Sequence, residues 1–420
     1  MIKSRLAMTG FFLATLKTSF SGSLKATRTK TMAHPFIQQL LNGQTVEYKP
    51  LGEIADYEQP QKYLVKSTNY RDEYPTPVLT AGKTFILGYT DETNGIYPAS
   101  QKPVIIFDDF TTANKWVDFD FKAKSSAMKI ITSKDEKQCL LKFIYYWLNT
   151  LPNELSNSDH KRQWISNYAN KLIPLPPLPV QKRIVEILDK FTELEKELEK
   201  ELEKRRKQYQ YYRDKLLSRE ELEKSGCEWK CLGEVCDIGD GLHGTPVYID
   251  NSEYKFINGN NLKNGYIVIS EKDKCIDKDT FEKLKIVFSR ENTLFMSING
   301  TIGNLAFYND EKIALGKSVA YFNIHSNRLL KNYLYYYLQT NTSLSYFENS
   351  KTGSTIKNLG LKALREYKIP IPSIEKQQQI VEILDKFDTL TQSISAGLPK
   401  EIELRQKQYE YYRNLLLTFD

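Results

Sequence analysis

Apolar residues recur at spacings of three, four and seven along two segments of the chain, residues 184–216 and 380–416. This spacing places apolar side chains on one face of an α-helix, and charged residues in the pattern EKELEKELEKRRK separate them in the first segment. The sequence therefore predicts two long amphipathic helices. The positions expected to pack the helices together are Ile184, Ile187, Phe191, Leu194, Leu198, Tyr209, Tyr212, Ile380, Ile383, Phe387, Leu390, Tyr409 and Tyr412.

A narrow apolar stripe cannot form a core alone, so each helix is expected to need the other as its partner. About 34 residues of helix would extend over about 50 Å. Prolines at 174, 176, 177 and 179 are expected to keep the chain extended before the first helix and not to continue inside it. Gly397 and Pro399 are expected to break or kink the second helix.

Shorter patterns before each helix predict strands. Residues 103–110 (PVIIFDDF) and 292–298 (NTLFMSI) are typical of buried strands, and residues 115–121 (KWVDFDF) alternate with a period of two. Residues 255–269 indicate a strand, a turn and a second strand, and Gly, Asn, Ser and Thr are common in the connections. These segments predict an α/β domain before each long helix.

The chain repeats itself. The segment IPLPPLPVQKRIVEILDKF (173–191) matches IPIPSIEKQQQIVEILDKF (369–387), and KQYQYYRDKLLS (207–218) matches KQYEYYRNLLLT (407–418). Upstream, YKPLGEIAD (48–56) is similar to WKCLGEVCD (229–237). The sequence therefore predicts two tandem copies of one unit related by approximate symmetry. The N-terminal segment 36–53 looks like a junction whose preceding helix is missing, so it is expected to pack beside the end of the second long helix.

The net charge of +7 is a poor guide to partners. Residues 1–31 hold six Lys and Arg and no acid, and these account for all but one of the net positive charges. Any argument for nucleic acid must therefore rest on local patches and architecture. The short apolar run LAMTGFFLATL after a basic start is compatible with a secretory or transit peptide. A disordered extension upstream of Met32 is the alternative that we expect, because the repeating unit begins just after Met32.

Signatures of catalysis are mostly absent. GKT at 82–84 and GKS at 316–318 lack the first glycine of a phosphate-binding loop. Asp108 and Asp109 after a strand are compatible with a metal site, but a turn that ends the strand is the simpler interpretation. Cys227, Cys231, Cys236 and Cys275 form no C-x-x-C pair, so reduced thiols and no metal site are expected. No apolar run reaches the length of about 18 residues that spans a bilayer.

Polar and basic loops remain as candidates for DNA contact. Lys and Arg neutralise phosphates, Asn and Arg read base edges, and glycine lets the backbone approach closely, although such loops are usual on any protein surface. The candidates in the first domain are Thr111, Thr112, Asn114, Lys115, Lys122, Lys124, Ser125, Lys129, His160, Lys161 and Arg162. Those in the second are His243, Thr245, Asn258, Asn260, Asn261, Lys263, Asn299, Thr301, Lys317, Ser318, Lys351, Thr352 and Lys357.

Three features occur twice and in the same order: a variable domain, a proline-rich hinge with Q-x-x-I-V-x-I-L-D-K-F, and KQYxYYR-x-x-L-L. In this arrangement the chain resembles the DNA-specificity subunit of a type I restriction–modification system, from Met32 to the C-terminus. The stretches SSAMKI (125–130) and SINGTIGNLAF (297–307) also resemble parts of target-recognition domains of that family.

The resemblance implies an α+β protein with two α/β target-recognition domains in a pseudo-twofold tandem repeat, separated by two long helices that form an antiparallel coiled coil. The expected boundaries are a disordered extension (1–31), the first recognition domain (32–172), its hinge and spacer helix (173–228), the second domain (229–368) and its hinge and helix (369–420). The family implies that each domain reads half of a bipartite, asymmetric site on double-stranded DNA.

The resemblance also implies partners and cofactors. Two methyltransferase subunits would dock on the chain and use S-adenosylmethionine, and a translocase–nuclease subunit that needs ATP and Mg²⁺ could join them. The chain itself would hold no cofactor or metal, catalyse nothing and work in the cytoplasm without a membrane. Two alternatives stay open, a coiled-coil scaffold that binds only proteins, and a metal-dependent nuclease or methyltransferase with disguised motifs.

Overall fold

The computed structural model describes residues 34–80, 84–152, 162–353, 357–391, 393 and 396–419, so the expected extension 1–31 lies outside the described residues. The chain forms two compact units. The first comprises the chain up to Lys196 together with the segment from Leu404 onward, and the second comprises Glu197–Glu403. Each unit therefore combines one globular domain with parts of the long helices. Among the described residues no helix is long and apolar enough to cross a bilayer.

The first unit contains an antiparallel four-stranded sheet in the order β2-β8-β5-β6. Every residue of the predicted buried strand β5 is buried. Ile105 and Phe107 lie in a core shared with helices, and Val104 and Ile106 lie in a second core that includes residues of a smaller sheet. The strands are β2 (Ala55–Glu58), β8 (Met128–Ser133), β5 (Val104–Asp108) and β6 (Asn114–Val117). A smaller sheet, in which β3 pairs parallel to β7, contains β4 (Ile86–Thr90), β3 (Thr76–Leu79) and β7 (Lys122–Ala123).

The second unit repeats this topology, with an antiparallel sheet in the order β11-β18-β15-β16 and a separate parallel pair, β12 and β17. Its central strand β15 is buried throughout, as β5 is. The two domains thus share one fold, which confirms the α+β tandem repeat. The strands are β11 (Cys236–Asp240), β18 (Val319–Ile324), β15 (Thr293–Ser297), β16 (Leu305–Phe307), β12 (Lys255–Ile257) and β17 (Ile313–Leu315).

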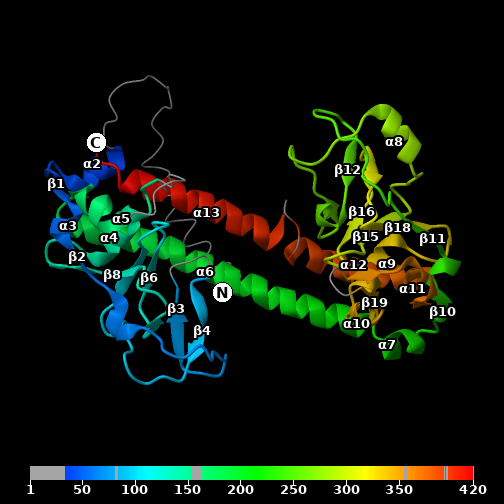
Figure 1. Cartoon of the computed structure of the whole chain (residues 1–420), viewed down its shortest axis with the longest axis horizontal. Coiled ribbons are helices and arrows are strands. Elements are labelled where there is room, and N and C mark those ends of the chain that lie inside the picture. The colour runs from blue at the N-terminus through cyan, green and yellow to red at the C-terminus, as the bar shows by residue number, and fades with distance from the viewer. Residues whose placement is uncertain are drawn as a thin grey trace. The chain divides into compact units, whose positions relative to one another are not determined.

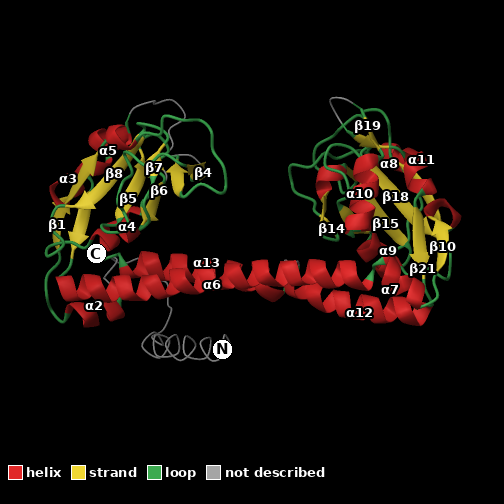
Figure 2. Cartoon of the chain, turned by 90° about the horizontal axis from the view of Figure 1, so that it is seen from below, coloured by secondary structure: helices red, strands yellow, loops and turns green. Residues whose placement is uncertain are grey.

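One aromatic-rich helix in each unit joins the sheet to the long helices. These are α4 (Leu141–Leu148) and α9 (Lys331–Leu338), and each buries six of its eight residues. Figure 2 shows α4 between the strands of the first domain and the helices α6 and α13. Such nearly all-round burial explains why both segments are apolar and aromatic on every side.

The long helices are α6 (Leu178–Leu216), with 39 residues, and a second rod in two pieces, α12 (Ile374–Thr391) and α13 (Gly397–Leu416). The prediction that Pro179 would stay outside the first helix is wrong. Pro179 lies in the first turn, where a missing N–H costs nothing because that group has no helical partner. The predicted break is confirmed, because α12 ends at Thr391 and α13 begins at Gly397, whose φ of +73° suits glycine.

Each proline-rich hinge forms a short antiparallel ladder with an upstream segment. In the first unit β9 (Leu172–Leu175) pairs with β1 (Glu47–Pro50), and in the second β21 (Lys368–Ile371) pairs with β10 (Glu228–Cys231). These two-stranded ladders consist of edges only, where proline is tolerated. The ladders explain why YKPLGE and WKCLGE recur along with the hinges.

The long helices pack antiparallel within each unit through the same pair of aromatic rings. Phe191 of α6 stacks on Tyr412 of α13 with ring centroids 5.4 Å apart, and Phe387 of α12 stacks on Tyr212 of α6 at 5.5 Å. In the first unit Gln406 also donates to Glu195 at 2.6 Å, so residue numbers rise along one helix as they fall along the other. The predicted coiled coil is therefore confirmed (Figure 1).

Most predicted packing positions are buried or partly buried. Tyr212 is 38% exposed but still stacks on Phe387. Ile383 is 41% exposed, whereas its equivalent Ile187 is 1% exposed. The prediction for Ile383 is therefore wrong. The first core, in which Ile187 is buried, also contains Ile37 and Leu41 of α2 (Pro35–Leu41). These share that core with Leu416 at the end of α13, which confirms the predicted packing of the N-terminal segment.

Residues that are identical in the two hinge motifs form equivalent hydrogen bonds in the two units. Gln181 is fully buried, accepts a hydrogen bond from the Leu140 backbone N–H and donates to the Pro176 carbonyl, and Gln377 makes the equivalent bonds in the second unit. The hydroxyl of Tyr146 donates to Asp189, as that of Tyr336 does to Asp385. Joining the hinge helix to its own domain therefore accounts for Gln and Asp in the repeated motif.

The shorter elements connect these parts. They are α3 (Leu51–Ile54), η1 (Pro60–Tyr63), α5 (Gln163–Ser166), η2 (Tyr168–Asn170), α7 (Arg219–Lys224), η3 (Leu232–Glu234), η4 (Gly259–Asn261), β13 (Leu262–Lys263), β14 (Tyr266–Ile267), α8 (Lys278–Leu284), α10 (Asn341–Asn349), β19 (Lys351–Thr352), β20 (Asn358–Leu359) and α11 (Leu361–Glu366).

Candidate nucleic-acid interface

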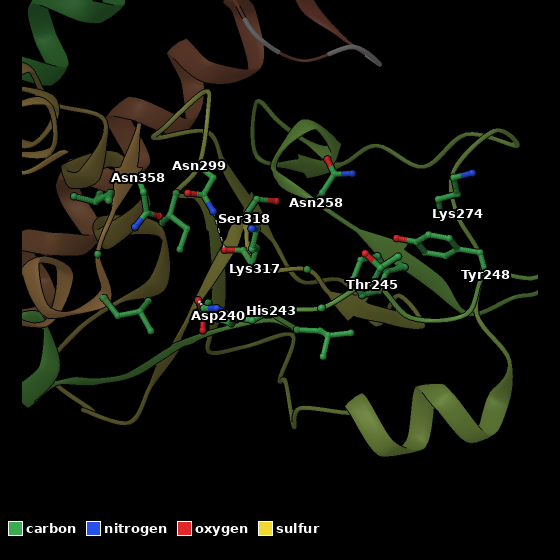
Figure 3. A pocket seen from close by; sticks show the side chains of 18 residues that line it. Asp240, His243, Thr245, Tyr248, Asn258, Lys274, Asn299, Lys317, Ser318 and Asn358 are labelled. Atoms are coloured by element: carbon green, nitrogen blue, oxygen red, sulfur yellow. Dashed lines mark hydrogen bonds and ion pairs between the residues drawn. The ribbon is translucent and has the colours of Figure 1, made fainter. Parts of the chain in front are cut away.

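Several loops of the second domain surround a cavity of about 850 Å³ (Figure 3). Its size lies in the range of pockets that hold small ligands or parts of larger ones. Six of the predicted DNA-contact residues line it: His243, Thr245, Asn258, Asn299, Lys317 and Ser318. They come from sequence positions more than 70 residues apart, so the fold assembles this site from loops that the sequence only showed separately.

Backbone hydrogen bonds hold these loops together. The Leu242 N–H donates to the Leu315 carbonyl at 2.8 Å, and the Lys317 N–H donates back to the Leu242 carbonyl at 3.0 Å. Gly241 is required beside them, because a Cβ atom there would collide with the backbone of Leu315. The Ser318 hydroxyl then accepts from the Gly259 N–H at 2.9 Å, which ties in the third loop.

The turn after the central strand β15 forms another wall. Gly300 and Gly303 have φ of +68° and +94°, so the turn needs glycine at both positions. The Gly300 N–H donates to the Lys357 carbonyl at 3.1 Å and the Leu359 N–H donates to Ile298 at 2.9 Å. The late segment around Lys357 is thereby joined to this turn, which places the turn's Asn299 at the cavity.

The cavity combines cationic, amide and aromatic groups. Lys317 is exposed and forms no ion pair with any residue that the structure describes, whereas His243 contacts Asp240 at 2.8 Å. The ammonium of Lys274 lies 5.4 Å from the centroid of the Tyr248 ring. Such a lining can attract phosphate with Lys317 and form hydrogen bonds to base edges with its amides.

The other residues of the cavity were not predicted from the sequence, and Tyr248, Lys274 and Asn358 are among them. Asn358 directly follows the predicted Lys357, so extending that loop would have found it. Tyr248 and Lys274 lie in segments without a distinctive pattern, and only the pairing of Ile249 with Cys275 brings their neighbours together.

The other candidates of the second domain lie outside the cavity. Asn260, Lys263, Thr301, Thr352 and Lys357 are exposed, and Lys351 pairs with Glu348. Asn261 is 6% exposed and donates to the Val268 carbonyl and to Asp273, so it supports η4. We withdraw Asn261 from the set of DNA contacts because its amide is used inside the domain.

The first domain has a comparable site at the equivalent turn, between β5 and β6. Asp108 accepts from the Phe110 N–H at 2.9 Å and from the Thr111 hydroxyl at 2.5 Å, so the simpler interpretation of Asp108 as a turn residue agrees with the structure. Asp109 accepts from the backbone of Gln163 and Trp164, both at 2.8 Å. As in the second domain, a segment from near the end of the domain's sequence is joined by hydrogen bonds to the turn after the central strand.

Three residues of the first domain that were predicted to contact DNA are buried, so the prediction is wrong for them. The ammonium of Lys122 lies 2.9 Å from Glu92, and this hydrogen bond, with those from the Ser67 and Lys66 backbone, lowers the pKa of Glu92 to about 2. Lys129 is fully buried at 3.4 Å from Asp109, and Thr112 is 3% exposed. Buried ammonium groups are engaged by carboxylates and do not reach phosphates.

The remaining candidates of the first domain lie at its surface. Thr111, Lys115 and Arg162 are exposed, and Asn114 accepts from Asn149 at 2.9 Å. Lys124 donates to the Tyr70 hydroxyl at 3.0 Å, and the partly buried Ser125 accepts from the Ala127 N–H. His160 and Lys161 lie outside the described residues.

Metal and nucleotide sites are not indicated in the described ranges. No group of three or more His, Cys, Asp or Glu side chains could hold a metal there. A hydrogen bond from Lys255, at 3.0 Å, lowers the pKa of the Cys275 thiol, and burial raises the pKa of Cys236 to about 12. The motif GKS is followed by the strand β18, whereas a phosphate-binding loop leads into a helix.

Comparison with known proteins agrees with this architecture. The family model described as "Type I restriction modification DNA specificity domain" matches twice, at residues 43–204 and 224–404. The type I restriction enzyme EcoR124I/EcoR124II specificity subunit of Escherichia coli is 50% identical over 403 residues, which cover 91% of this chain and 97% of that protein.

Two solved structures share the fold. A type I restriction–modification S subunit from M. genitalium superposes with a TM-score of 0.53 at 17% identity, over 90% of this chain and 97% of that one. A second chain, from a structure described as the basis of complex assembly and conformational transition of the type I R-M system, superposes with a TM-score of 0.52 at 17% identity. The match covers 93% of this chain and all of that one. By its two matched domains, its sequence identity and its fold, the chain belongs to the family of type I restriction–modification specificity subunits.

Proposed function

We propose that this chain reads a bipartite, asymmetric DNA site with its two globular domains. The observation that carries this proposal is that each domain places polar side chains at the same topological position, the turn after its central buried strand. A late segment is joined to that turn in both domains, through Asp109 in the first and Gly300 in the second. The residues at the two turns differ, so the two half-sites should differ as well.

The proposal includes a scaffold role for the long helices. Two tyrosines at equivalent positions of the repeat, Tyr211 and Tyr411, are 60% and 58% exposed, whereas the nearby Tyr209 and Tyr412 are buried. Each ring contacts the following tyrosine edge-on, at 5.4 and 5.3 Å. Exposed aromatic side chains are enriched in protein interfaces. Two copies of one methyltransferase subunit, each meeting one tyrosine, would use this repeated surface.

In this proposal all chemistry belongs to the partners. The methyltransferase subunits bind S-adenosylmethionine and modify adenine in each half-site, and a translocase–nuclease subunit with ATP and Mg²⁺ can join them in the cytoplasm. This chain supplies positioning: exposed cations such as Lys317 and Lys115 attract the DNA backbone, and the turns present groups to base edges. The binding is therefore expected to weaken steeply with salt.

Methylome sequencing of cells that carry this chain with its methyltransferase tests the proposal and should reveal one split, asymmetric motif. Purified complex should then shift a duplex with that motif at much lower concentration than a scrambled duplex. Equal binding to every duplex would instead favour a scaffold that recognises only proteins. Methylation of DNA by this chain alone would contradict the division of labour.

A further inference from the structure

Buried polar groups without hydrogen-bond partners are concentrated at one turn of the first domain. Five buried side-chain polar atoms lack such a partner among the described residues, and three of them belong to Asp109, Thr112 and Lys129. Asp109 and Lys129 attract each other as an ion pair at 3.4 Å, but their geometry does not form a hydrogen bond. Folded proteins leave few such groups without a hydrogen bond, because each one lowers the stability of the folded state. This turn therefore destabilises the fold.

The backbone of the same turn is strained. Thr112 has a φ of +61°, in the left-handed region that β-branched residues rarely adopt. Two hydrogen bonds hold it there: the Thr112 N–H donates to the Asp108 carbonyl at 2.9 Å, and the Asp108 N–H donates to the Ala113 carbonyl at 2.8 Å. Strain of this kind persists where the surrounding structure imposes it, and it is common at functional sites.

This costly turn presents one aromatic side chain to solvent. Phe110 is 44% exposed, and its N–H is capped by Asp108. Its nearest exposed neighbours in sequence are polar or small, Thr111 and Ala113, and the cation Lys115 follows on β6. The ring is therefore an exposed apolar surface among groups that can bind phosphate or water.

We propose that Phe110 is a specificity-determining residue that contacts the C5 methyl group of a thymine in one DNA half-site. This inference rests on the proposed function. A phenyl ring neither donates nor accepts an ordinary hydrogen bond, and the thymine methyl is the apolar feature that a base pair displays in the major groove. More than half of the Phe110 surface is covered by the domain, which suits a flat contact better than insertion between bases.

The second domain differs at the equivalent turn. There Asn299 lies at the cavity, and the residues with left-handed backbone are the glycines Gly300 and Gly303, whereas the first domain has Thr112 in this conformation. Glycine adopts this conformation without strain, and an amide recognises polar base edges. The thymine-methyl contact therefore belongs to the half-site of the first domain, and it contributes to the asymmetry of the target.

Replacing single thymines by deoxyuridine tests the contact, because this change removes only the methyl group. The full chain with its methyltransferase subunits is titrated with duplexes that carry the determined motif and one replacement at a time. For the wild type we expect about a fourfold loss of affinity at one position, the effect of burying about one methyl group. Phe110→Ala should bind the normal duplex at least about fourfold more weakly than the wild type does. Replacing the thymine at that position should then lower its affinity no further.

Matched variants separate this result from general damage. Leu87→Ala removes another exposed apolar side chain of the same unit, 41% exposed on β4, and should keep the wild-type response to deoxyuridine. Phe110→Leu keeps an apolar contact and should keep part of that response. Three results would overturn the inference: the same loss of affinity with deoxyuridine in Phe110→Ala as in the wild type, no thymine whose replacement lowers affinity, or a motif half without any A·T pair. In each case, selective binding of the motif would still support the proposed function. Loss of all selectivity in the wild type would overturn both.

Discussion

At the scale of single residues, burial decides which cations of the polar loops can meet DNA. Lys122 and Lys129 neutralise carboxylates inside the first domain, whereas Lys317 lies exposed at the cavity of the second. In the sequence all three look alike, since each follows or flanks a short apolar run. Their different roles follow from neighbours that are distant in sequence, Glu92 and Asp109 among them.

Lys317→Ala is expected to weaken DNA binding several-fold and to reduce the slope of log K against log salt by about 0.9, the effect of one phosphate contact. The measurement is a series of binding titrations of the complex at different salt concentrations. Lys224→Ala is the matched control, because it removes the same charge from α7, where Lys224 pairs with Glu220 at 2.8 Å. An unchanged salt slope in Lys317→Ala would show that this side chain meets no phosphate.

Asp388 is expected to make the stability of the second unit depend on pH. Burial, with a smaller contribution from Asp385, raises its pKa from 3.8 to about 6, and one of its carboxylate oxygens has no hydrogen-bond partner in the described part of the chain. The buried hydroxyl of Tyr209 also lacks one, and Tyr335, Tyr336 and Arg213 complete the surroundings. The first copy has Thr192 at the equivalent position.

Asp388→Thr is therefore expected to stabilise the protein above pH 6, where the wild type must keep a carboxylate charged in a buried site. The folded-state pKa lies above the unfolded value, so protonation favours the folded state. The free energy of unfolding of the variant should exceed that of the wild type by at most about 3 kcal/mol at pH 8. This difference should shrink as pH falls through 6 and should vanish near pH 4. Urea unfolding at several pH values measures it, and a gap independent of pH would exclude this cause.

At the scale of elements, the join between each long helix and its domain is the part that the two copies share most closely. In both units a buried glutamine bonds backbone groups of the domain, and a tyrosine of α4 or α9 bonds the aspartate of the hinge helix. These bonds fix the helix on its own domain. The internal repeat is therefore explained in large part by folding, before any partner is considered.

Tyr146→Phe and Tyr336→Phe are each expected to lower the free energy of unfolding by about 1–2 kcal/mol, because each removes a hydrogen bond to a carboxylate. The two losses should be similar, since the bonds are equivalent. Denaturant unfolding followed by circular dichroism gives the values. Tyr211→Phe, which alters an exposed hydroxyl, should change stability by less than about 0.5 kcal/mol, and a cost as large as that of the buried tyrosines would contradict this assignment.

At the scale of the whole molecule, the chain consists of two equivalent units that differ in their surface turns. The stacks Phe191–Tyr412 and Phe387–Tyr212 have the same interplanar angle of 26°, so the duplication extends to the geometry of the helix contacts. Under the proposed function, each domain then determines one half of the motif, and the helices determine the gap between the halves.

Exchanging one globular domain for that of a relative with another target should change one half of the methylated motif and leave the other half intact. Removing one heptad from both α6 and α13 should instead shorten the gap by about 10 Å, or about three base pairs, with both halves unchanged. Methylome sequencing reads out both experiments. A domain exchange that altered both halves would contradict the assignment of one half-site to each domain.

The sequence by itself determined the tandem repeat, the long helices, the hinges and the central strands. These are local or periodic patterns, in which the spacing of apolar residues or a repeated motif indicates the element directly. The N-terminal junction was predicted in the same way, from its similarity to the linker before the second domain. The start of α6 at Leu178 was missed, because proline in a first turn is compatible with either assignment.

Only the tertiary structure decided which polar residues are exposed together. It brought Asn258, Asn299 and Lys317 to one cavity, buried Lys122 and Lys129, and exposed Ile383 although the identical octapeptide buries Ile187. The physical reason is that burial and pairing depend on neighbours from distant parts of the chain. Two identical segments therefore adopt the same helix, but the side chains around them decide what each residue of that helix can contact.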